Sequence, residues 1–400
     1  MKRIFTLILV LLMTFALSMG CTPSEEPVAE DNTDGIEVDI EECDIEEPPE
    51  DIPEELPEEP PEEEVLEEEE VVIERRPFDV APGDPGFYAV RFLEHMNDYL
   101  PYRVPFTTRE LEAAQWIADT LLSMGFYHEQ IEMQSFRYDV VTSSWWGDAS
   151  WGIRWFEEQG YYDELEWTDY SQNVILTIPG RSEETIVIGA HYDSLAYAGV
   201  SDNAAGVALL LEAAYRMQDH DHYHTLQFVF FGAEEVGLVG AFYFVDSLSA
   251  TEVNNLVLAV NADVIVEGPI FVYATASVSY LPEAPEFVLW GSEFWPTLYY
   301  CSLTLEIDHI ANALVYDDIH LMAIPEAIFS PTDHLAFLEF WIPVMYLYGT
   351  YDPVYPDFFV RNILHTPDDN LDFIMTETPG RIEDSFRTFV RFLEEVLLIE

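Results

Sequence analysis

The amino-acid sequence of 400 residues predicts an α/β fold, in which a mostly parallel central β-sheet is flanked by helices on both faces. Two observations carry this prediction. After residue 107, short apolar and β-branched segments alternate with helical ones, as is typical of parallel strands that are buried on both faces. Acidic residues come directly after several of these apolar segments, and ligands of such sheets bind beyond the carboxyl ends of the strands. A disordered acidic tail is predicted to precede this fold.

Residues 1–21 are typical of an export signal. Lys2 and Arg3 precede an apolar run from Ile4 to Leu17 that is short for a membrane span, and small residues lead to Cys21. The segment SMGC resembles a bacterial lipobox, which implies a lipid anchor on Cys21. A plain cleaved secretion signal is the alternative. Both interpretations place the mature protein outside the cytoplasm, and the anchor would be its contact with the membrane.

Residues 22–76 are predicted to be a disordered linker. The segment is mostly Glu, Asp and Pro, so it cannot bury enough apolar surface to offset the entropy of ordering, and its charges repel one another. We interpret it as a tether; a functional acidic tail that binds calcium or a basic partner is the alternative. The whole chain has 15 Lys+Arg against 77 Asp+Glu and a formal charge of -62, which argues against a nucleic-acid partner. Cys43 and Cys301 do not indicate a disulfide framework.

The predicted folded domain spans residues 77–400. Residues 107–125 combine a threonine cap, a glutamate in the first turn, helically spaced apolar residues and a closing glycine, which predicts an amphipathic helix. Residues 131–141 predict a strand. Residues 143–167 form an aromatic, acidic insertion that either overhangs a pocket or packs against the domain, and we favour packing. Further strands are expected at residues 172–180, 184–193, 225–235, 254–265 and 341–350, and further helices at 204–217 and 378–399.

Polar side chains collect at the predicted strand ends. They are His191 and Asp193 after IVIGA, Asp202 before a helix, Glu234 and Glu235 after VFFGA, Asp263 after VLAVNA, and His365 in NILHTPDDN. Singly, each has a simpler interpretation: a hydrogen-bonded loop histidine, a helix cap at Asp202, or a solvated turn at the glutamate pair. Together, imidazole and carboxylate groups suit zinc. Two histidines and three carboxylates suffice for two metals that share one bridging carboxylate, with one further glutamate left as base.

The motifs HYDS, SDNAAG, GAEEVGLVGA, NAD, TDHLAF and HTPDDN, in this order, resemble the extracellular zinc-dependent aminopeptidases with two co-catalytic metals, whose superfamily also contains glutaminyl cyclases. The resemblance covers roughly residues 107–400 and implies a zinc-exopeptidase-like, phosphorylase/hydrolase-like sandwich. The loop LAYAGVSDNAAG and the segment NADVI depart from the family pattern, which puts the loop shape in doubt but removes no ligand.

Carried over by motif position, the resemblance implies that His191 and Asp263 hold one zinc ion and that Glu235 and His365 hold the other, with Asp202 bridging. It implies that Glu234 is the general base. It further implies that Asp193 orients His191, as metal-ligating histidines usually require. His334 would polarise the reacting carbonyl or its oxyanion.

The implied activity is that of a metallo-aminopeptidase with two zinc ions, acting on peptides with a free N-terminus. The first alternative is a glutaminyl cyclase-like acyltransferase with one zinc ion held by Asp202, Glu235 and His365; the motif DNAAG favours the peptidase. A catalytically inactive surface-binding lipoprotein would have lost ligands, and none is lost. Carboxypeptidase or dipeptidase activity stays open. The sequence does not indicate the side-chain preference, the native metal or the oligomeric state.

Overall fold

The structure, a computed structural model, describes residues 75–139, 150–162, 165–276, 302–324, 328, 330–351 and 363–400. These residues belong to one compact unit, Arg75–Glu400. Arg75, which the predicted boundary assigns to the linker, forms ion pairs of 2.5 Å with Asp98 and Asp372 of this unit. The predicted export signal with Cys21, residues 22–74 with Cys43, and Cys301 lie outside the described residues, so the expectations about them stay predictions.

Eight strands and ten helices carry the described part of the fold. The strands are β1 Ile131–Arg137, β2 Tyr170–Ile178, β3 Thr185–His191, β4 Thr225–Phe231, β5 Leu256–Ala262, β6 Ile270–Ala276, β7 Met322–Ala323 and β8 Val344–Thr350. The helices are α2 Ala89–Tyr99, α3 Thr108–Ser123, α4 Ser150–Glu158, α5 Ala205–Met217, α6 Val239–Ser247, α7 Ala250–Asn255, α8 Ser302–Leu314, α9 His334–Glu339, α10 Leu371–Glu377 and α11 Arg381–Val396.

The strands form one mixed sheet in the order β1-β2-β4-β3-β5-β8-β6-β7. The central strands β4, β3, β5 and β8 run parallel to one another. Towards the edges, β1 pairs antiparallel with β2, β2 with β4, and β6 with β8. The predicted α/β class with a parallel centre is therefore confirmed. The antiparallel edges could not be read from the sequence, because an apolar run of this length does not indicate the direction of its strand.

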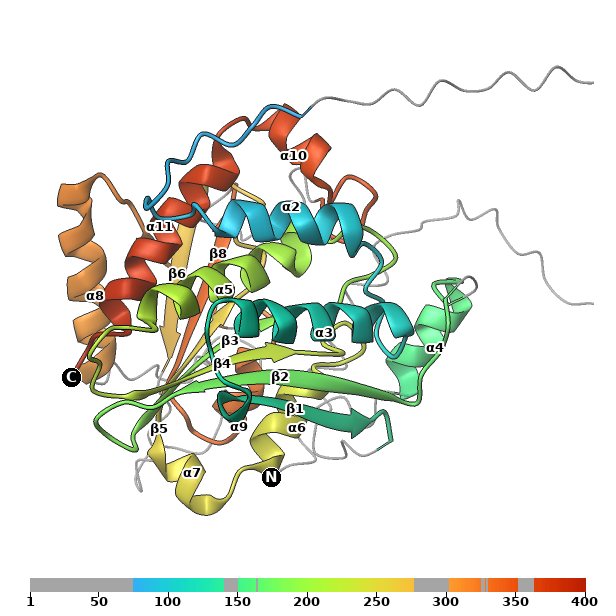
Figure 1. The fold of residues 1–400 in the computed structure, drawn as a ribbon, viewed down its shortest axis with the longest axis horizontal. Helices are drawn as coiled ribbons and strands as arrows, with labels where there is room; N and C mark the ends of the chain where they lie inside the picture. Colours follow the sequence, from blue (N-terminus) through green and yellow to red (C-terminus); the bar gives the residue numbers. More distant parts are fainter. Residues whose placement is uncertain are drawn as a thin grey trace, which may run out of the picture. The chain divides into compact units, whose positions relative to one another are not determined.

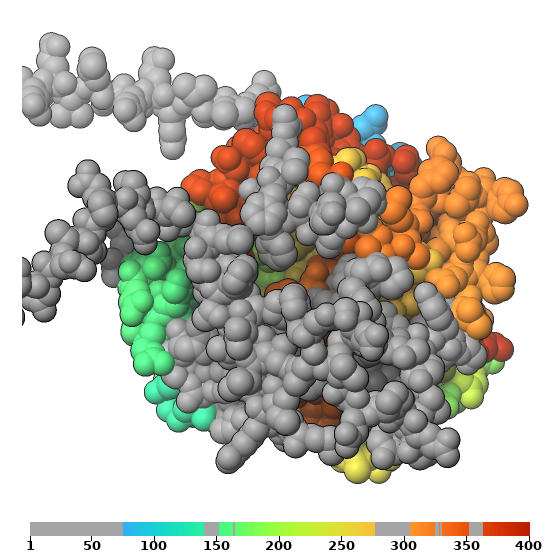
Figure 2. Space-filling model, turned by 180° about the vertical axis from the view of Figure 1, so that it is seen from behind, coloured from blue at the N-terminus to red at the C-terminus, as the bar shows by residue number. Residues whose placement is uncertain are grey.

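Helices cover both faces of the sheet, as predicted. Figure 1 shows α2, α5 and α11 side by side over one face, with α3 beside them. The alternation of side chains along each strand explains the two layers: Phe228 and Phe230 of β4 pack in the core below these helices, whereas Val229 and Phe231 pack in a second core with α4, α6 and α9. In the view from behind, α4 (green) and α8 (orange) lie at opposite edges (Figure 2).

The helix predicted at residues 107–125 begins and ends close to the expected positions. The Thr107 side chain accepts a hydrogen bond from the Glu110 amide at 3.4 Å, and the Glu110 carboxylate accepts one from the Phe106 amide at 2.7 Å. The first amides of a helix lack acceptors within the helix, and Thr107 supplies one for Glu110. The carboxylate of Glu110 holds the chain one residue before this cap.

A buried glutamate provides the equivalent acceptor for α2, whose own first residues offer no side-chain cap. Glu212 of α5 accepts hydrogen bonds from the amides of Gly86, Tyr88 and Ala89 at 2.8–2.9 Å, and from Nε of Arg216 at 2.7 Å. The N-terminus of α2 is thereby fixed to α5.

The aromatic segment predicted at residues 143–167 is described in part. Within α4, Ile153 and Phe156 are buried in the second core, and the Phe156 ring lies 5.2 Å from that of Tyr161 and 5.8 Å from that of Tyr162. These residues pack against the domain, in line with the favoured interpretation. No helix in the part of the chain that the structure describes is both long enough and apolar enough to cross a bilayer.

Packing of α11 against the sheet provides a test of this arrangement. Phe389 is fully buried, and its ring lies 5.6 Å from Phe271 of β6. Because truncation removes buried apolar surface and leaves a cavity, we expect Phe389→Ala to lower the free energy of unfolding by about 3–5 kcal/mol in denaturant titrations. Tyr316, which is 93% exposed, is the control. Tyr316→Ala should change the free energy of unfolding by less than about 0.5 kcal/mol. Equal losses would contradict the placement of α11.

Candidate metal centre

The predicted site residues come together at the carboxyl ends of three adjacent parallel strands. His191 is the last residue of β3, the Glu234-Glu235 pair follows β4, and Asp263 directly follows β5. Asp202 lies in the turn Val200–Ala204 that leads into α5, and its own backbone angles, φ -119° and ψ 86°, are not helical. His365 arrives from the segment after β8. Neighbouring parallel strands end at the same edge of a sheet, so this convergence follows from the topology.

Two groups of donor atoms share Asp202. In the first group, Nε2 of His191 lies 3.2 Å from Oδ1 of Asp202 and 3.3 Å from Oδ1 of Asp263. In the second group, Nε2 of His365 lies 3.1 Å from Oδ2 of Asp202 and 3.3 Å from Oε2 of Glu235. The donor atoms of each group lie within 4.8 Å of one another. Asp202 therefore turns one carboxylate oxygen towards each group.

The hydrogen bonding of His191 shows that this donor set fits a cation. Its Nδ1 lies 3.2 Å from the backbone carbonyl oxygen of Asp193, which can only accept, so Nδ1 carries the hydrogen. In the neutral ring, the lone pair of Nε2 faces the carboxylate oxygens of Asp202 and Asp263, and a proton or a metal cation between these atoms would relieve their repulsion. Within the part of the chain that the structure describes, Nε2 of His191, Oδ1 of Asp263 and Oε1 of Glu235 are buried without a hydrogen-bond partner. A divalent ion between such nitrogen and oxygen atoms would satisfy them, and zinc accepts both kinds of ligand.

The ionisable groups of the site perturb one another strongly. Burial raises the pKa of Glu234 well above its usual value, and the charges of Asp333 and Glu235 add to the effect. Burial, with the charge of Asp202, raises the pKa of Glu235 to about 7. Burial would also raise the pKa of Asp202, but the two imidazoles next to its carboxylate outweigh this effect and lower that pKa. The pKa of His191 is raised although burial opposes this, because acidic groups surround the ring. The site thus has an excess of negative charge, which a bound cation would reduce.

Asp193 contacts both the histidine and the glutamate pair. Its carboxylate lies 3.5 Å from Nδ1 of His191, farther than its backbone carbonyl oxygen. The same carboxylate accepts hydrogen bonds from the backbone amides of Glu234 and Glu235, both at 3.1 Å. The family resemblance implied only that Asp193 orients His191. In the structure the backbone of Asp193 makes the shorter contact with His191, and its side chain holds the turn after β4.

Asp369, which sequence analysis did not single out, supports Asp202. Its carboxylate accepts hydrogen bonds from the amides of Ser201 at 2.6 Å and Asp202 at 3.1 Å, and burial raises its pKa to about 7. It lies four residues after His365 in the motif HTPDDN, so the motif that supplies a candidate ligand also supplies the acceptor that holds the bridging residue.

Arg103 is a second residue that sequence analysis missed. Its guanidinium is fully buried and donates to four carbonyl oxygens at 2.6–2.9 Å, those of Tyr192, Leu100, Ala198 and Gly199. Burial lowers its pKa to about 10. Three of these carbonyls belong to the loop between β3 and the turn of Asp202, so Arg103 fixes the path between two candidate ligands. Nothing in the spacing of Arg103 indicated this role.

His334 and Asp333 lie at the start of α9, and both are fully buried. Nε2 of His334 lies 2.8 Å from the carbonyl oxygen of Ile328, and its ring stacks on Tyr346 with centroids 4.8 Å apart. Neither contact is with a donor residue of the two groups. Asp333 has no hydrogen-bond partner for either carboxylate oxygen among the described residues, and burial raises its pKa well above the usual value. Sequence analysis quoted its motif, TDHLAF, but selected only the histidine.

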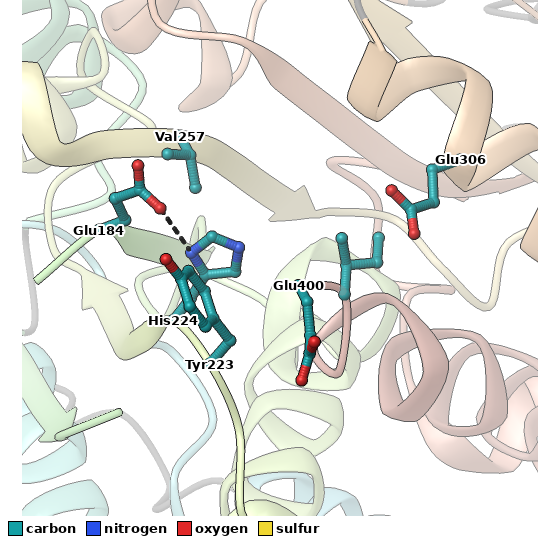
Figure 3. A pocket seen from close by; sticks show the side chains of 7 residues that line it. Glu184, Tyr223, His224, Val257, Glu306 and Glu400 are labelled. Atoms are coloured by element: carbon teal, nitrogen blue, oxygen red, sulfur yellow. Dashed lines mark ion pairs between the residues drawn. The ribbon is translucent and has the colours of Figure 1, made fainter. Parts of the chain in front are cut away.

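Two concave regions lie at opposite ends of the strands. A small one adjoins the second donor group and is lined by Leu195, Tyr197, Gly199, Asp202, Glu235, His365 and Asp369. A cavity of about 340 Å³ lies at the amino ends of β3, β4 and β5, where His224 faces Glu184 at 3.9 Å (Figure 3). The larger cavity is therefore remote from the candidate ligands.

Comparisons with known proteins agree on the fold. A zinc aminopeptidase from Bacillus subtilis has a similar structure, with a TM-score of 0.56 and 15% identity over 79% of this chain and 96% of that one. A glutaminyl cyclase from Tannerella forsythia is similar at a TM-score of 0.53 and 16% identity, over 78% and 98% of the two chains. At these identities the likeness concerns the fold and does not distinguish the two activities.

Sequence relatives match over shorter segments. A protein of Mycobacterium tuberculosis named as a probable lipoprotein aminopeptidase is 37% identical over 98 residues, which are 24% of this chain and 20% of that protein. The first curated relatives are matched over 19–55% of their own length. Residues 173–390, which include every predicted site residue, match peptidase family M28. This match covers more than half of the sequence, and the chain therefore belongs to peptidase family M28.

Proposed function

We propose that this protein is a zinc-dependent aminopeptidase that uses two metal ions. The observation that carries the proposal is the pair of donor groups on either side of Asp202, each with one histidine and one further carboxylate. Membership of family M28 and the aminopeptidases among its sequence relatives support a peptidase.

In this proposal His191 and Asp263 hold one ion, Glu235 and His365 hold the other, and Asp202 contacts both. Bound zinc would polarise the scissile carbonyl and lower the pKa of a water molecule. The protein supplies the geometry: Nδ1 of His191 is committed to the Asp193 carbonyl oxygen, which leaves Nε2 free to bind.

Glu234 is the proposed general base. It is adjacent to the ligand Glu235 and shares the turn that Asp193 holds through both backbone amides. Burial raises the pKa of its carboxylate, which makes it a better proton acceptor than an exposed glutamate. Glu234 would accept a proton from the attacking water and return it to the leaving amine.

A buried acid beside the donor groups favours a substrate with a free amino terminus. Neither carboxylate oxygen of Asp333 has a hydrogen-bond partner among the described residues, and this residue is close enough to affect the pKa of Glu234. An amino group can donate hydrogen bonds to such oxygens, whereas a C-terminal carboxylate has no hydrogen to donate. This supports an aminopeptidase over a carboxypeptidase.

The glutaminyl cyclase alternative uses only Asp202, Glu235 and His365. In that case His191 and Asp263 would have no role, although they form a group as compact as the other. The deciding experiment is zinc analysis of the purified mature chain by plasma mass spectrometry, together with assays on aminoacyl chromogenic substrates and on an N-terminal glutamine peptide. Two zinc ions with amide hydrolysis support the aminopeptidase. One zinc ion with cyclisation and no hydrolysis would replace it by the cyclase.

The shared position of Asp202 predicts the metal content of variants. Asp202→Asn should lower zinc binding at both groups, because the amide carries only one oxygen and no charge. His191→Ala should lower it at one group, and the bound zinc should fall from about two ions per chain to about one. The measurement is zinc content after equilibrium dialysis against a fixed free zinc concentration. Equal stoichiometry in the two variants would argue against a bridging Asp202.

The proposed roles of the neighbouring glutamates predict that the same substitution lowers activity at both positions but lowers zinc content at only one. Glu234→Gln should lower kcat by about 10²–10⁴-fold with zinc content unchanged, because it removes a proton acceptor and no ligand. Glu235→Gln should lower zinc content as well as activity. Steady-state kinetics and zinc analysis of both variants check this. Normal turnover by Glu234→Gln would exclude it as the base.

Burial of His334 predicts a pH dependence of stability and bears on its suggested role. Burial lowers its pKa to about 4, so the ring is neutral near pH 7, with its hydrogen on the Nε2 that faces Ile328. A neutral ring in this form has no hydrogen on Nδ1 to donate to an oxyanion, so the geometry does not favour the polarising role.

The unfolded chain binds a proton on His334 below about pH 6.5, whereas the native chain binds it only below about 4. The stability that the neutral ring contributes is therefore complete above pH 6.5 and is lost as the pH falls towards 4. Denaturant titrations should show that the stability of the wild type relative to His334→Gln decreases by about 1.5 kcal/mol from pH 6.5 to 5. A difference independent of pH would contradict neutral burial.

A further inference from the structure

The turn that follows β4 is held almost entirely by side chains from other elements. All four backbone amides of residues 232–235, here called the four-amide turn, donate to buried side-chain oxygens. The pairs are Gly232 to Oδ1 of Asn173 at 3.1 Å, Ala233 to Oε1 of Glu110 at 2.9 Å, Glu234 to Oδ1 of Asp193 at 3.1 Å, and Glu235 to Oδ2 of Asp193 at 3.1 Å.

The backbone of this turn would not adopt its conformation without support. Ala233 has φ of 56°, a left-handed conformation that residues with a side chain adopt rarely. Such a conformation persists where surrounding contacts over-determine it. The carbonyl groups of the turn are also used, because those of Gly232 and Ala233 accept from the amides of Gly240 and Val239 at 3.1 Å. The direction of the Glu234 side chain is thus set by contacts outside its own segment.

Glu110 makes more contacts than a helix cap requires. Its Oε2 accepts from the Phe106 amide at 2.7 Å, which completes the cap of α3. Its Oε1 accepts from the Ala233 amide and from Oγ of Ser171 at 2.7 Å. The side chain is fully buried, and each of these donors is uncharged. A buried carboxylate without a cationic partner is costly, and a cap alone could be made at the surface.

We infer that Glu110 is a positioning residue for the reaction: it fixes the backbone at Ala233 from α3 and so aims the carboxylate of the adjacent Glu234, while Asn173 does the same at Gly232. This inference rests on the proposed function of Glu234 as the base. Glu110 does not touch the substrate or the metal in this scheme. It acts through the four-amide turn.

Glu110→Gln tests this role with little change in shape. The carboxylate offers acceptors on both sides, two donors meeting Oε1 and one meeting Oε2. The amide has one oxygen and one NH₂ group, so in either orientation the NH₂ group faces a backbone N–H, that of Phe106 or that of Ala233. The turn or the cap must therefore give way.

Glu212→Gln is the matched control, because Glu212 is another fully buried glutamate that accepts from three backbone amides, at the N-terminus of α2. Hydrogen exchange of the mature chain should become faster at residues 232–238 in Glu110→Gln only, and near residues 86–89 in Glu212→Gln only. With aminoacyl substrates, Glu110→Gln should lower kcat at least about tenfold with KM within about threefold, since small misplacement of a reacting group costs rate. Glu212→Gln should leave kcat within about twofold of the wild-type value. Both Glu110→Gln and Glu212→Gln should lower the melting temperature.

The outcomes separate this inference from the proposed function. Unchanged exchange at residues 232–238, or equal loss of kcat in the two variants, would overturn it. If the wild type hydrolyses no amide substrate, the proposed function fails, and the exchange result still decides whether Glu110 holds the turn. If Glu110→Gln does not fold, Glu110→Asp keeps the charge but is shorter by one methylene, and the same exchange and kinetic outcomes apply to it.

Discussion

Carboxylates that lie close together inside a protein repel one another, and at the carboxyl ends of β3, β4 and β5 this repulsion must be offset for the fold to be stable. Asp193, Asp202, Asp263 and Asp333 are each at most 8% exposed, and the Glu234-Glu235 pair lies among them. Much of the surrounding structure supplies positive partial charge to this place. Backbone amides meet the carboxylates of Asp193 and Asp369, and the guanidinium of Arg103 is buried nearby, where it donates to four backbone carbonyl oxygens.

The repulsion between these carboxylates is not fully compensated at the atoms where a metal would bind. Nε2 of His191 and Oδ1 of Asp263 are buried and have no hydrogen-bond partner among the residues that the structure describes, whereas the oxygens of Asp193 that support the turn are paired. The same residue type thus serves two purposes within a few ångströms. Carboxylates that meet backbone amides hold the frame, and carboxylates left unpaired are available to a cation.

Strand positions and candidate ligands could be predicted because both depend on local sequence. Continuous apolar runs predicted the positions of β3, β4, β5 and β8. The polar residues at the ends of three of these runs predicted that His191, Glu235 and Asp263 lie at one edge of the sheet. The supporting residues could not be found in this way. Glu110 accepts a hydrogen bond from Ala233, 123 positions away. In the sequence, a glutamate in the first turn of a helix is already explained by that position, so nothing indicated a second role for Glu110. The carboxylate of Asp369 was overlooked for the same reason, since a turn residue after a proline has an ordinary local explanation.

The support of Asp202 has a consequence for the order in which the centre can form. The acceptor for its amide is Asp369, 167 positions later, and a ligand of the second donor group, His365, lies in the same late segment. During synthesis from the N-terminus, the strands that carry His191, Glu235 and Asp263 exist long before this segment does. In the nascent chain, the acidic residues at these strand ends therefore precede both the imidazole of His365 and the carboxylate of Asp369 that accepts from the Asp202 amide. The second donor group can form only after the segment that carries His365 and Asp369 has been synthesised and has folded against the turn of Asp202.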